Sequence, residues 1–184
     1  MAFGRRKFPV LFDLSLELFN LEARFVNANI VKGLKILIEN KDEIGADRLV
    51  NALAAYKLYG GPAVVVDFGT ATTFCGVSAK GEYLGGAIAP GIGISRDALH
   101  EKTAKLPSIE IEFPKEIIGK DTIEAMRSGL LFGYISMVEG MIERFKKELG
   151  KKTKVIATGG FATLIKKGTK VFDVVNPDLT LEGL

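Results

Sequence analysis

The stretch Val64-Val65-Val66-Asp67-Phe68-Gly69-Thr70-Ala71-Thr72-Thr73 decides the fold, because it joins a buried strand to a polar turn. Residues 63–66 are all apolar and include three β-branched valines, which predicts a central strand. Asp67 follows at its end, Gly69 lets the backbone approach an anion, and Thr70 adds a hydroxyl beside the turn amides. A carboxylate in this position suits a metal cation rather than a phosphate. A hairpin whose aspartate only caps the strand explains the stretch equally well.

Strand and helix patterns alternate through the rest of the chain. The predicted strands are residues 63–67, 72–78, 82–88, 153–157 and 170–175, and the predicted helices are residues 47–59, 95–105, 121–149 and 162–166. Earlier in the chain, residues 12–19 predict a short helix, and residues 23–30 and 34–38 have the apolar content of strands. Gly60-Gly61-Pro62 is typical of a helix end, and Ala79-Lys80-Gly81 is typical of a hairpin turn.

The longest predicted helix, residues 121–149, carries two further signals. Asp121 and Glu124 predict a pair of capping interactions at its start. Gly129, Gly133 and Gly140 each cost up to about 1 kcal/mol against alanine in an exposed helix, so close backbone packing is expected as compensation. A second copy of the chain and the chain's own sheet are equally good candidates for the packing partner.

Composition narrows the class of protein. The 184 residues are 47% hydrophobic with a formal net charge of +3, which indicates one well-cored domain with a small appendage. The lysine clusters at 146–147, 151–154 and 166–167 are typical of solvated surface, and without interleaved aromatic residues they argue against nucleic-acid binding. One cysteine excludes an internal disulfide, and together with the lack of a secretory signal it predicts a cytoplasmic protein. No apolar run approaches the roughly 18 residues of a membrane span.

Several motifs occur in the order of one enzyme family. They are Gly45-Ala46-Asp47-Arg48, Gly85-Gly86-Ala87-Ile88-Ala89-Pro90-Gly91, Leu106-Pro107, Gly119-Lys120-Asp121-Thr122, Ser128-Gly129, Thr158-Gly159-Gly160 and Leu179-Thr180-Leu181-Glu182-Gly183-Leu184. With them, the chain resembles a type III pantothenate kinase over roughly residues 20–184. The resemblance implies an α/β fold of the actin-like, ribonuclease-H-like class, with a mixed sheet flanked by helices. It further implies that residues 39–184 form the C-terminal half of such a kinase and that residues 1–38 are a remnant or replaced N-terminal segment.

The resemblance assigns a substrate end to the site. Asp47 is expected to orient and deprotonate the primary hydroxyl of pantothenate, with an N-cap of the following helix as the structural alternative. Gly45 and Arg48 flank Asp47, and with Ala46 they complete the expected substrate-binding motif. Arg48 suits the pantothenate carboxylate, and a pair with a nearby glutamate is its alternative. Thr122 matches a position of substrate contact in the family, although a simple helix start explains it slightly better.

The resemblance also assigns a nucleotide end. Asp67 is expected to hold a monovalent cation, K⁺ or NH₄⁺, beside the Mg²⁺ that accompanies ATP. Gly69 and Thr70 are expected to contact a phosphate of ATP, and Gly159-Gly160 to permit close approach of the nucleotide, although glycine turns between a strand and a helix are common. The implied partners are pantothenate, ATP and a second copy in a homodimer, with no nucleic acid and no membrane.

Two departures from the family pattern favour a rival interpretation. Family members open on an Asp-x-Gly-Asn-Thr turn that holds the ATP phosphates, but the only Asp-x-Gly here is Asp67-Phe68-Gly69, and the chain opens on a basic segment at residues 1–9. Cys75 stands where the family usually carries aspartate, and it is expected to be a small buried side chain. These departures favour an inactive or regulatory actin-like fragment. A DNA-linked accessory factor is a third interpretation, which the modest charge argues against.

Overall fold

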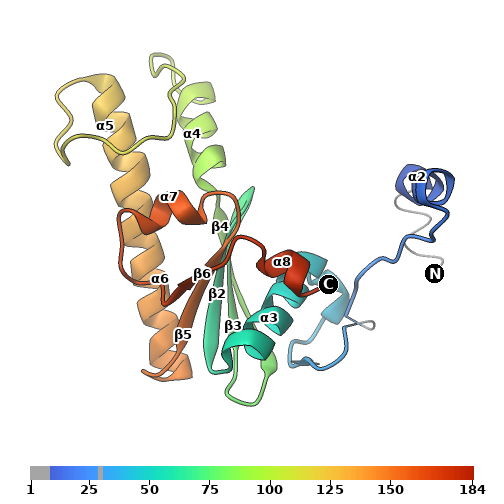
Figure 1. Ribbon diagram of the computed structural model, residues 1–184. Helices are drawn as coiled ribbons and strands as arrows, with labels where there is room; N and C mark the ends of the chain where they lie inside the picture. The colour runs from blue at the N-terminus through green and yellow to red at the C-terminus, as the bar shows by residue number, and fades with distance from the viewer. Residues whose placement is uncertain (1–8, 29–30) are drawn as a thin grey trace.

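The computed structural model describes residues 9–28 and 31–184 (Figure 1). The strands are β1 Lys35–Ile36, β2 Ala63–Phe68, β3 Ala71–Val77, β4 Glu82–Pro90, β5 Lys154–Thr158 and β6 Val174–Val175. The helices are α2 Pro9–Phe19, α3 Ala46–Tyr59, α4 Ile92–Glu101, α5 Thr122–Ser128, α6 Tyr134–Leu149, α7 Ala162–Lys166 and α8 Leu179–Glu182, with a 3₁₀ turn η1 Lys41–Glu43 and a π-helical segment η2 Gly129–Gly133. The basic start at residues 1–8 and the end of the predicted 23–30 strand lie outside the described residues.

One six-stranded sheet organises the fold, in the order β1-β4-β3-β2-β5-β6. β2, β3 and β4 form the predicted antiparallel meander, while β5 pairs parallel with β2, and β6 parallel with β5. β1 adds a short parallel strand on the far edge of β4. The sheet is therefore mixed, and the parallel strands β2 and β5 direct their carboxyl ends toward the same edge.

The structure differs from the prediction at the last strand, in residues 23–28 and at the last helix, and it shifts the bounds of α4 and shortens β1. The last strand shrinks from 170–175 to β6, because the Val171 N–H donates to the Thr169 hydroxyl instead of to a strand. Residues 23–28 are irregular, because β1 is the edge strand of the described sheet and these residues do not pair with it. The helix α8 was not predicted, because four residues are too few to show a helical period.

The long predicted helix forms, but as three segments. α5, η2 and α6 follow one another without a break, and the π-helical turn of η2 begins at Gly129 and ends at Gly133. The Asp121 carboxylate caps α5 by accepting the Glu124 N–H at 2.9 Å. The other half of the predicted cap is wrong, because the Glu124 carboxylate accepts the N–H of Lys115 and pairs with Arg127.

Apolar layers cover both faces of the sheet, and Figure 1 shows α5 and α6 along one face and α3 with α8 on the other. The first layer includes Val64, Val66, Phe68, Phe74, Leu131, Tyr134, Val138 and Ile142. The second includes Leu49, Ala52, Ala55, Val65, Cys75, Ile156 and Leu179. Alternate side chains of β2 enter opposite layers, so Asp67 falls on the face that α3 covers. Within the described ranges, no helix is both long and apolar enough to cross a bilayer.

Candidate functional site

Asp67 lies at the end of β2 with a threonine on either side across the sheet. Strand register places Thr73 of β3 and Thr158 of β5 opposite it. Its carboxylate is half-buried, and one oxygen, Oδ2, accepts a hydrogen bond from Asn51 Nδ2 of α3 at 2.9 Å. The predicted strand-to-carboxylate turn is therefore present, and its carboxylate points into a polar corner between the sheet and α3.

The electrostatic surroundings of Asp67 favour a bound cation. Burial, and after it the negative charge of Asp47, raises the pKa of the Asp67 carboxyl, while the hydrogen bond from Asn51 lowers it. Two carboxylates therefore act on one another at this edge of the sheet. A positive ion between or beside them would relieve both the desolvation and the repulsion.

The predicted glycine turns lie against Asp67 and one another. Gly159 follows β5 with φ of +89°, and a Cβ there would lie 2.4 Å from Asp67 Oδ1 and 2.7 Å from Phe68 N. The Phe161 N–H donates to the Phe68 carbonyl at 3.3 Å, which ties the turn after β5 to the end of β2. Gly69, Thr70 and Gly160 are exposed beside it. The structure thus brings together all five residues expected at the nucleotide end.

Thr158 is the most unusual side chain of this corner. It is 0% exposed, and its hydroxyl has no hydrogen-bond partner among the described residues. Buried polar groups of native proteins nearly always have a partner, so an orphaned hydroxyl next to a carboxylate fits a site that receives a ligand or ion. An oxygen donor set of this kind suits K⁺ or Mg²⁺. The described residues hold no group of three or more His, Cys, Asp or Glu side chains arranged for a metal, so Asp67 would share the ion with other oxygens.

The substrate end of the site lies at the start of α3. Gly45 is the N-cap and Ala46 the first helical residue, so the interpretation of Asp47 as the N-cap is wrong. A Cβ on Gly45 would lie 2.4 Å from Asp47 Oδ1, because the carboxylate folds back over the glycine. Asp47 is exposed, and its charge reaches Asp67. A carboxylate held in this way is free to meet a substrate hydroxyl.

Arg48 extends from α3 across β3 and β4. Its Nε donates to Cys75 Sγ at 3.4 Å, and its guanidinium carbon lies 5.9 Å from the ring centroid of Tyr83. A Cβ on Gly86 would lie 3.2 Å from its Nη2. No carboxylate of the residues described forms an ion pair with it, so the alternative of a glutamate partner is not observed. The cation is therefore oriented by neutral groups, and Cys75 is buried as predicted.

Thr122 is not brought to the other substrate residues within one chain. It is the exposed first residue of α5, which lies on the opposite face of the sheet from α3 (Figure 1). The two helix starts that carry Thr122 and Asp47 therefore do not converge on one pocket of a single chain.

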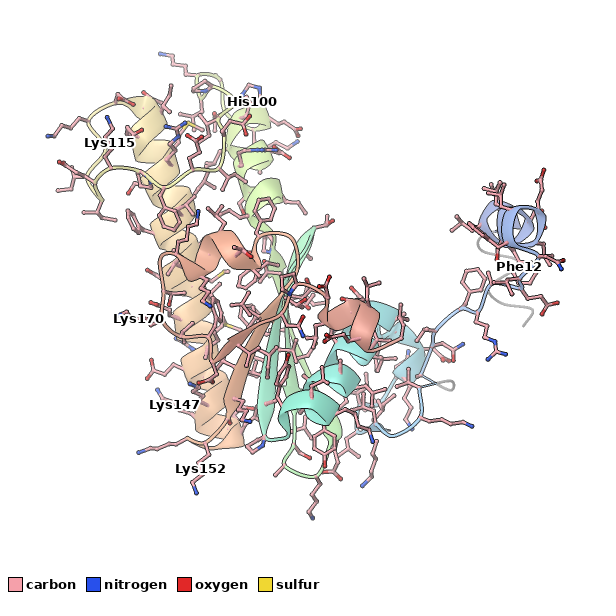
Figure 2. The ribbon with its side chains drawn as sticks, in the orientation of Figure 1. Phe12, His100, Lys115, Lys147, Lys152 and Lys170 are labelled. Carbon is pink, nitrogen blue, oxygen red and sulfur yellow. The ribbon has the colours of Figure 1, made fainter. Side chains whose placement is uncertain are left out.

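Side chains outside this corner have structural roles or face solvent. His100 is exposed on α4, with Nδ1 2.8 Å from the Leu106 carbonyl oxygen. Figure 2 shows Lys147, Lys152 and Lys170 projecting outward from the helical side, and Lys147 forms an exposed ion pair with Glu143.

The sequence did not predict three residues of the site, which are Asn51, Thr158 and Thr180. Asn51 lies one helical turn after Asp47 and on the same face, which is a signal that helical spacing provides. Thr158 and Thr180 stand inside motifs already singled out, but only the register of β5 and the packing of α8 bring them beside Asp67 and Asn51.

A similar solved structure defines the fold class of the chain, and a family model defines its family. A Campylobacter jejuni crystal structure, described as a conserved Baf family transcriptional activator, matches with a TM-score of 0.57 at 21% identity over 80% of this chain and 65% of that chain. The predicted actin-like, ribonuclease-H-like fold class is thus confirmed. A family model described as type III pantothenate kinase matches residues 5–144. The chain belongs to this family.

Curated relatives agree with that assignment. Type III pantothenate kinases from two strains of Dehalococcoides mccartyi are 56% and 55% identical over 159 residues, which is 86% of this chain. The aligned residues span 60% and 62% of the length of those relatives. The chain therefore matches only part of the relatives' length.

Proposed function

We propose that the chain works as part of an ATP-dependent pantothenate kinase, which makes 4′-phosphopantothenate in the first step of coenzyme A biosynthesis. The observation that carries the proposal is the joint position of Asp47, Asp67 and Arg48 on one face and one edge of the sheet. The names of the relatives support the same reaction.

In this proposal Arg48 binds the carboxylate of pantothenate. Its Nε is engaged by Cys75, so the two terminal nitrogens remain for a forked pair of hydrogen bonds. Asp47 then orients the primary hydroxyl and takes its proton as the oxygen attacks the γ-phosphorus of ATP and ADP leaves. Phosphoryl transfer through a loose transition state depends mainly on such positioning, and general-base assistance contributes about 10²- to 10⁴-fold.

The nucleotide occupies the other end of the site. Gly69, Thr70, Gly159 and Gly160 receive ATP, because their exposed turns lie around the Asp67 carboxylate. Asp67 would hold the monovalent cation, K⁺ or NH₄⁺, beside the Mg²⁺ of the nucleotide, and Thr158 offers a further oxygen. These ions would supply positive charge that offsets the repulsion between carboxylate and phosphate.

A homodimer completes the proposed site. Thr122 would contact pantothenate bound by the other copy, since α5, which begins with Thr122, lies on the opposite face of the sheet from α3, which carries Asp47 (Figure 1). A Cβ built on Gly129 or Gly133 meets no described atom within 4 Å beyond its own helix and chain neighbours, so the chain's own sheet does not fill that face. A second α5–α6 helix is the partner that we propose for it.

The proposed division of the chain places the C-terminal actin-like half at residues 39–184 and a remnant or replaced N-terminal segment at residues 1–38. Side chains of α2 support this division, because Val10, Leu18 and Phe19 are 67%, 66% and 70% exposed. Such apolar exposure on one short helix is typical of a surface that another domain covers.

The alternative is an inactive or regulatory fragment. It is favoured by the lack of an Asp-x-Gly-Asn-Thr turn in the 184 residues. Calorimetric titration with ATP and with pantothenate separately tests binding, and a coupled assay for ADP release, with and without an added N-terminal half from a relative, tests turnover. If the chain binds both ligands without turnover and becomes active when the N-terminal half is added, it works as part of a kinase. If it binds both ligands but shows no turnover with or without that half, the regulatory alternative is supported.

Arg48→Ala tests the substrate assignment. We expect the affinity for pantothenate to fall by about 10- to 100-fold, because a hydrogen-bonded charge pair contributes roughly 1.5–3 kcal/mol. Lys152→Ala is the control, since it removes an exposed positive charge in the turn between α6 and β5, which belongs neither to the proposed site nor to the proposed helix interface. Equal affinities in the two variants would show that the carboxylate binds elsewhere.

A further inference from the structure

A chain of three buried or half-buried side chains connects the last helix to the Asp67 carboxylate. Thr180 of α8 donates from Oγ1 to Asn51 Oδ1 at 2.7 Å. Asn51 of α3 donates from Nδ2 to Asp67 Oδ2 at 2.9 Å. Asn51 is 2% exposed, so both ends of its amide meet their partners away from solvent. Such a network has one consistent direction, because the carboxylate can only accept.

The two partners of Asn51 have different parts in the network. An asparagine amide has similar shape in its two orientations, and only its partners decide which end faces which neighbour. The Asp67 carboxylate fixes the NH₂ group toward itself, and the Thr180 hydroxyl donates to the amide oxygen at the other end and restrains the side chain in that orientation. Without the Thr180 hydroxyl, the buried Asn51 oxygen would lose this hydrogen bond, and the amide would lose one of its two restraints.

The helix α8 is itself firmly seated. Leu179 is 0% exposed in the layer between α3 and the sheet. Asn176 Nδ2 donates to Tyr59 Oη at 2.8 Å and to Glu182 Oε2 at 2.6 Å. A Cβ on Gly183 would lie 2.2 Å from the Val50 carbonyl oxygen, so the end of α8 touches α3 directly. Thr180 is thus held at a fixed point relative to Asn51.

The network engages only one oxygen of Asp67. Oδ2 accepts from Asn51, whereas Oδ1 faces Gly159, where a Cβ would lie 2.4 Å away. With Oδ2 fixed, the rotation of the carboxylate is restricted, and Oδ1 is presented to the glycine turn that follows β5. This is the side on which the orphaned Thr158 hydroxyl also lies.

We propose that Asn51 and Thr180 are positioning residues that hold Asp67 Oδ2 so that Oδ1 meets the cation of a bound nucleotide. The proposal rests on the function proposed above, and it adds the C-terminal helix to the machinery of the nucleotide site. Neither residue touches the nucleotide or the ion, and both act through the orientation of Asp67.

The first measurement is independent of any ligand. Hydrogen exchange of the Asn51 side-chain amide is followed by NMR on the full chain, the Thr180→Val variant and the Thr180→Ser variant. We expect slow exchange in the unmodified chain, exchange at least about 10-fold faster in Thr180→Val, and slow exchange restored in Thr180→Ser, which keeps the hydroxyl. Equal protection in all three chains would overturn the proposed network.

The second measurement uses ADP as the probe. The Mg²⁺ concentration that gives half-maximal ADP binding, and the same value for K⁺, are determined by calorimetry. We expect both values to rise about 10-fold in Thr180→Val and more in Asn51→Leu, as is typical when a partner of a metal ligand is removed. Thr163→Val, at an exposed threonine of α7, is the matched control and should leave both values unchanged.

The two measurements separate the possible failures. If the unmodified chain shows slow exchange of the Asn51 amide but does not bind ADP at any ion concentration, the proposed nucleotide function is wrong, and so is the role toward a cation. If ADP binds and Thr180→Val changes neither the Mg²⁺ nor the K⁺ dependence, the nucleotide site stands and the positioning role is overturned. Faster exchange together with a raised ion requirement, both reversed by Thr180→Ser, is the result that supports the proposal.

Discussion

Two buried threonines on opposite faces of the sheet differ in their hydrogen bonding, and the difference distinguishes the face that stabilises the fold from the face that carries the candidate site. Thr72 faces the layer of α6, is 0% exposed, and forms a hydrogen bond with the Tyr134 hydroxyl. Thr158 faces α3, is also 0% exposed, and has no partner among the described residues. On the first face the Thr72 hydroxyl has a partner and the surrounding layer is apolar, so this part of the sheet supports the fold. The second leaves a hydroxyl and a carboxylate oxygen available beside exposed glycine turns, so it can receive a ligand.

The apolar face should give the largest loss of stability. Leu131 is 0% exposed in the layer between α6 and the sheet. We expect Leu131→Ala to lower the free energy of unfolding by about 2–5 kcal/mol through lost burial and the remaining cavity. Urea denaturation measures the change. Ile123→Ala serves as the control, because Ile123 is 43% exposed and its loss should cost less than about 1 kcal/mol.

Removal of the hydrogen bond between Thr72 and Tyr134 on the same face should give the next largest loss of stability. Tyr134→Phe removes the partner of Thr72 and leaves a buried hydroxyl unsatisfied, at a cost of about 1–3 kcal/mol. Adding Thr72→Val removes the orphaned group, so the double variant should be no less stable than Tyr134→Phe alone. A double variant whose loss equals the sum of the two single losses would show that the two hydroxyls do not interact.

The sequence predicts the apolar face better than the site. Periodic apolar residues locate α3, the β2–β4 meander and the α5–α6 helix, because burial of one face leaves a regular pattern along the chain. Asp67, Gly159 and Asp47 are found because they stand at the ends of such elements. Asn51 and Thr180 are 129 residues apart and meet only through tertiary packing, so no local pattern reveals their contact.

The same limit explains the two errors at helix starts. Asp47 has the composition of an N-cap, yet Gly45 occupies that position, because the carboxylate bends back over a residue without a side chain. Glu124 has the spacing of a capping box, yet it meets Lys115 and Arg127, which a connection of irregular backbone brings close. At Glu124 a neighbour from the preceding connection competes successfully with the local preference, whereas at Asp47 the glycine two residues earlier takes the cap position.

The site face should respond to pH through Asp67. Since burial and Asp47 raise the pKa of the Asp67 carboxyl, the folded chain binds that proton more tightly than the unfolded chain does. Its contribution to stability is therefore greatest at acidic pH, falls as pH rises from about 4 through the raised value, and is level above it. Asp67→Asn should remove this decline.

Urea denaturation of the unliganded chain and of Asp67→Asn across this pH range measures the difference between them. The difference should grow with pH in favour of the variant and then stop growing. Asp173→Asn is a suitable control, because Asp173 is exposed and accepts the N–H of Val155 near the start of β5, away from Thr158 at the end of that strand. A constant difference between the unmodified chain and Asp67→Asn would show that the carboxylate is not perturbed.

Replacing each of the two threonines by valine should give the sharpest comparison, with the smallest change in stability at Thr158. Thr72→Val removes one hydrogen bond of the Tyr134 hydroxyl and leaves the bond to the Ile92 backbone, so it should cost about 0.5–1.5 kcal/mol. Thr158→Val removes a hydroxyl that has no partner, so the unfolding free energy should change by less than about 1 kcal/mol, in either direction. ADP binding should reverse the order, weakening in Thr158→Val and not in Thr72→Val. A costly Thr158→Val with normal ADP binding would mean that this hydroxyl serves the fold and that the two faces do not differ in the way described.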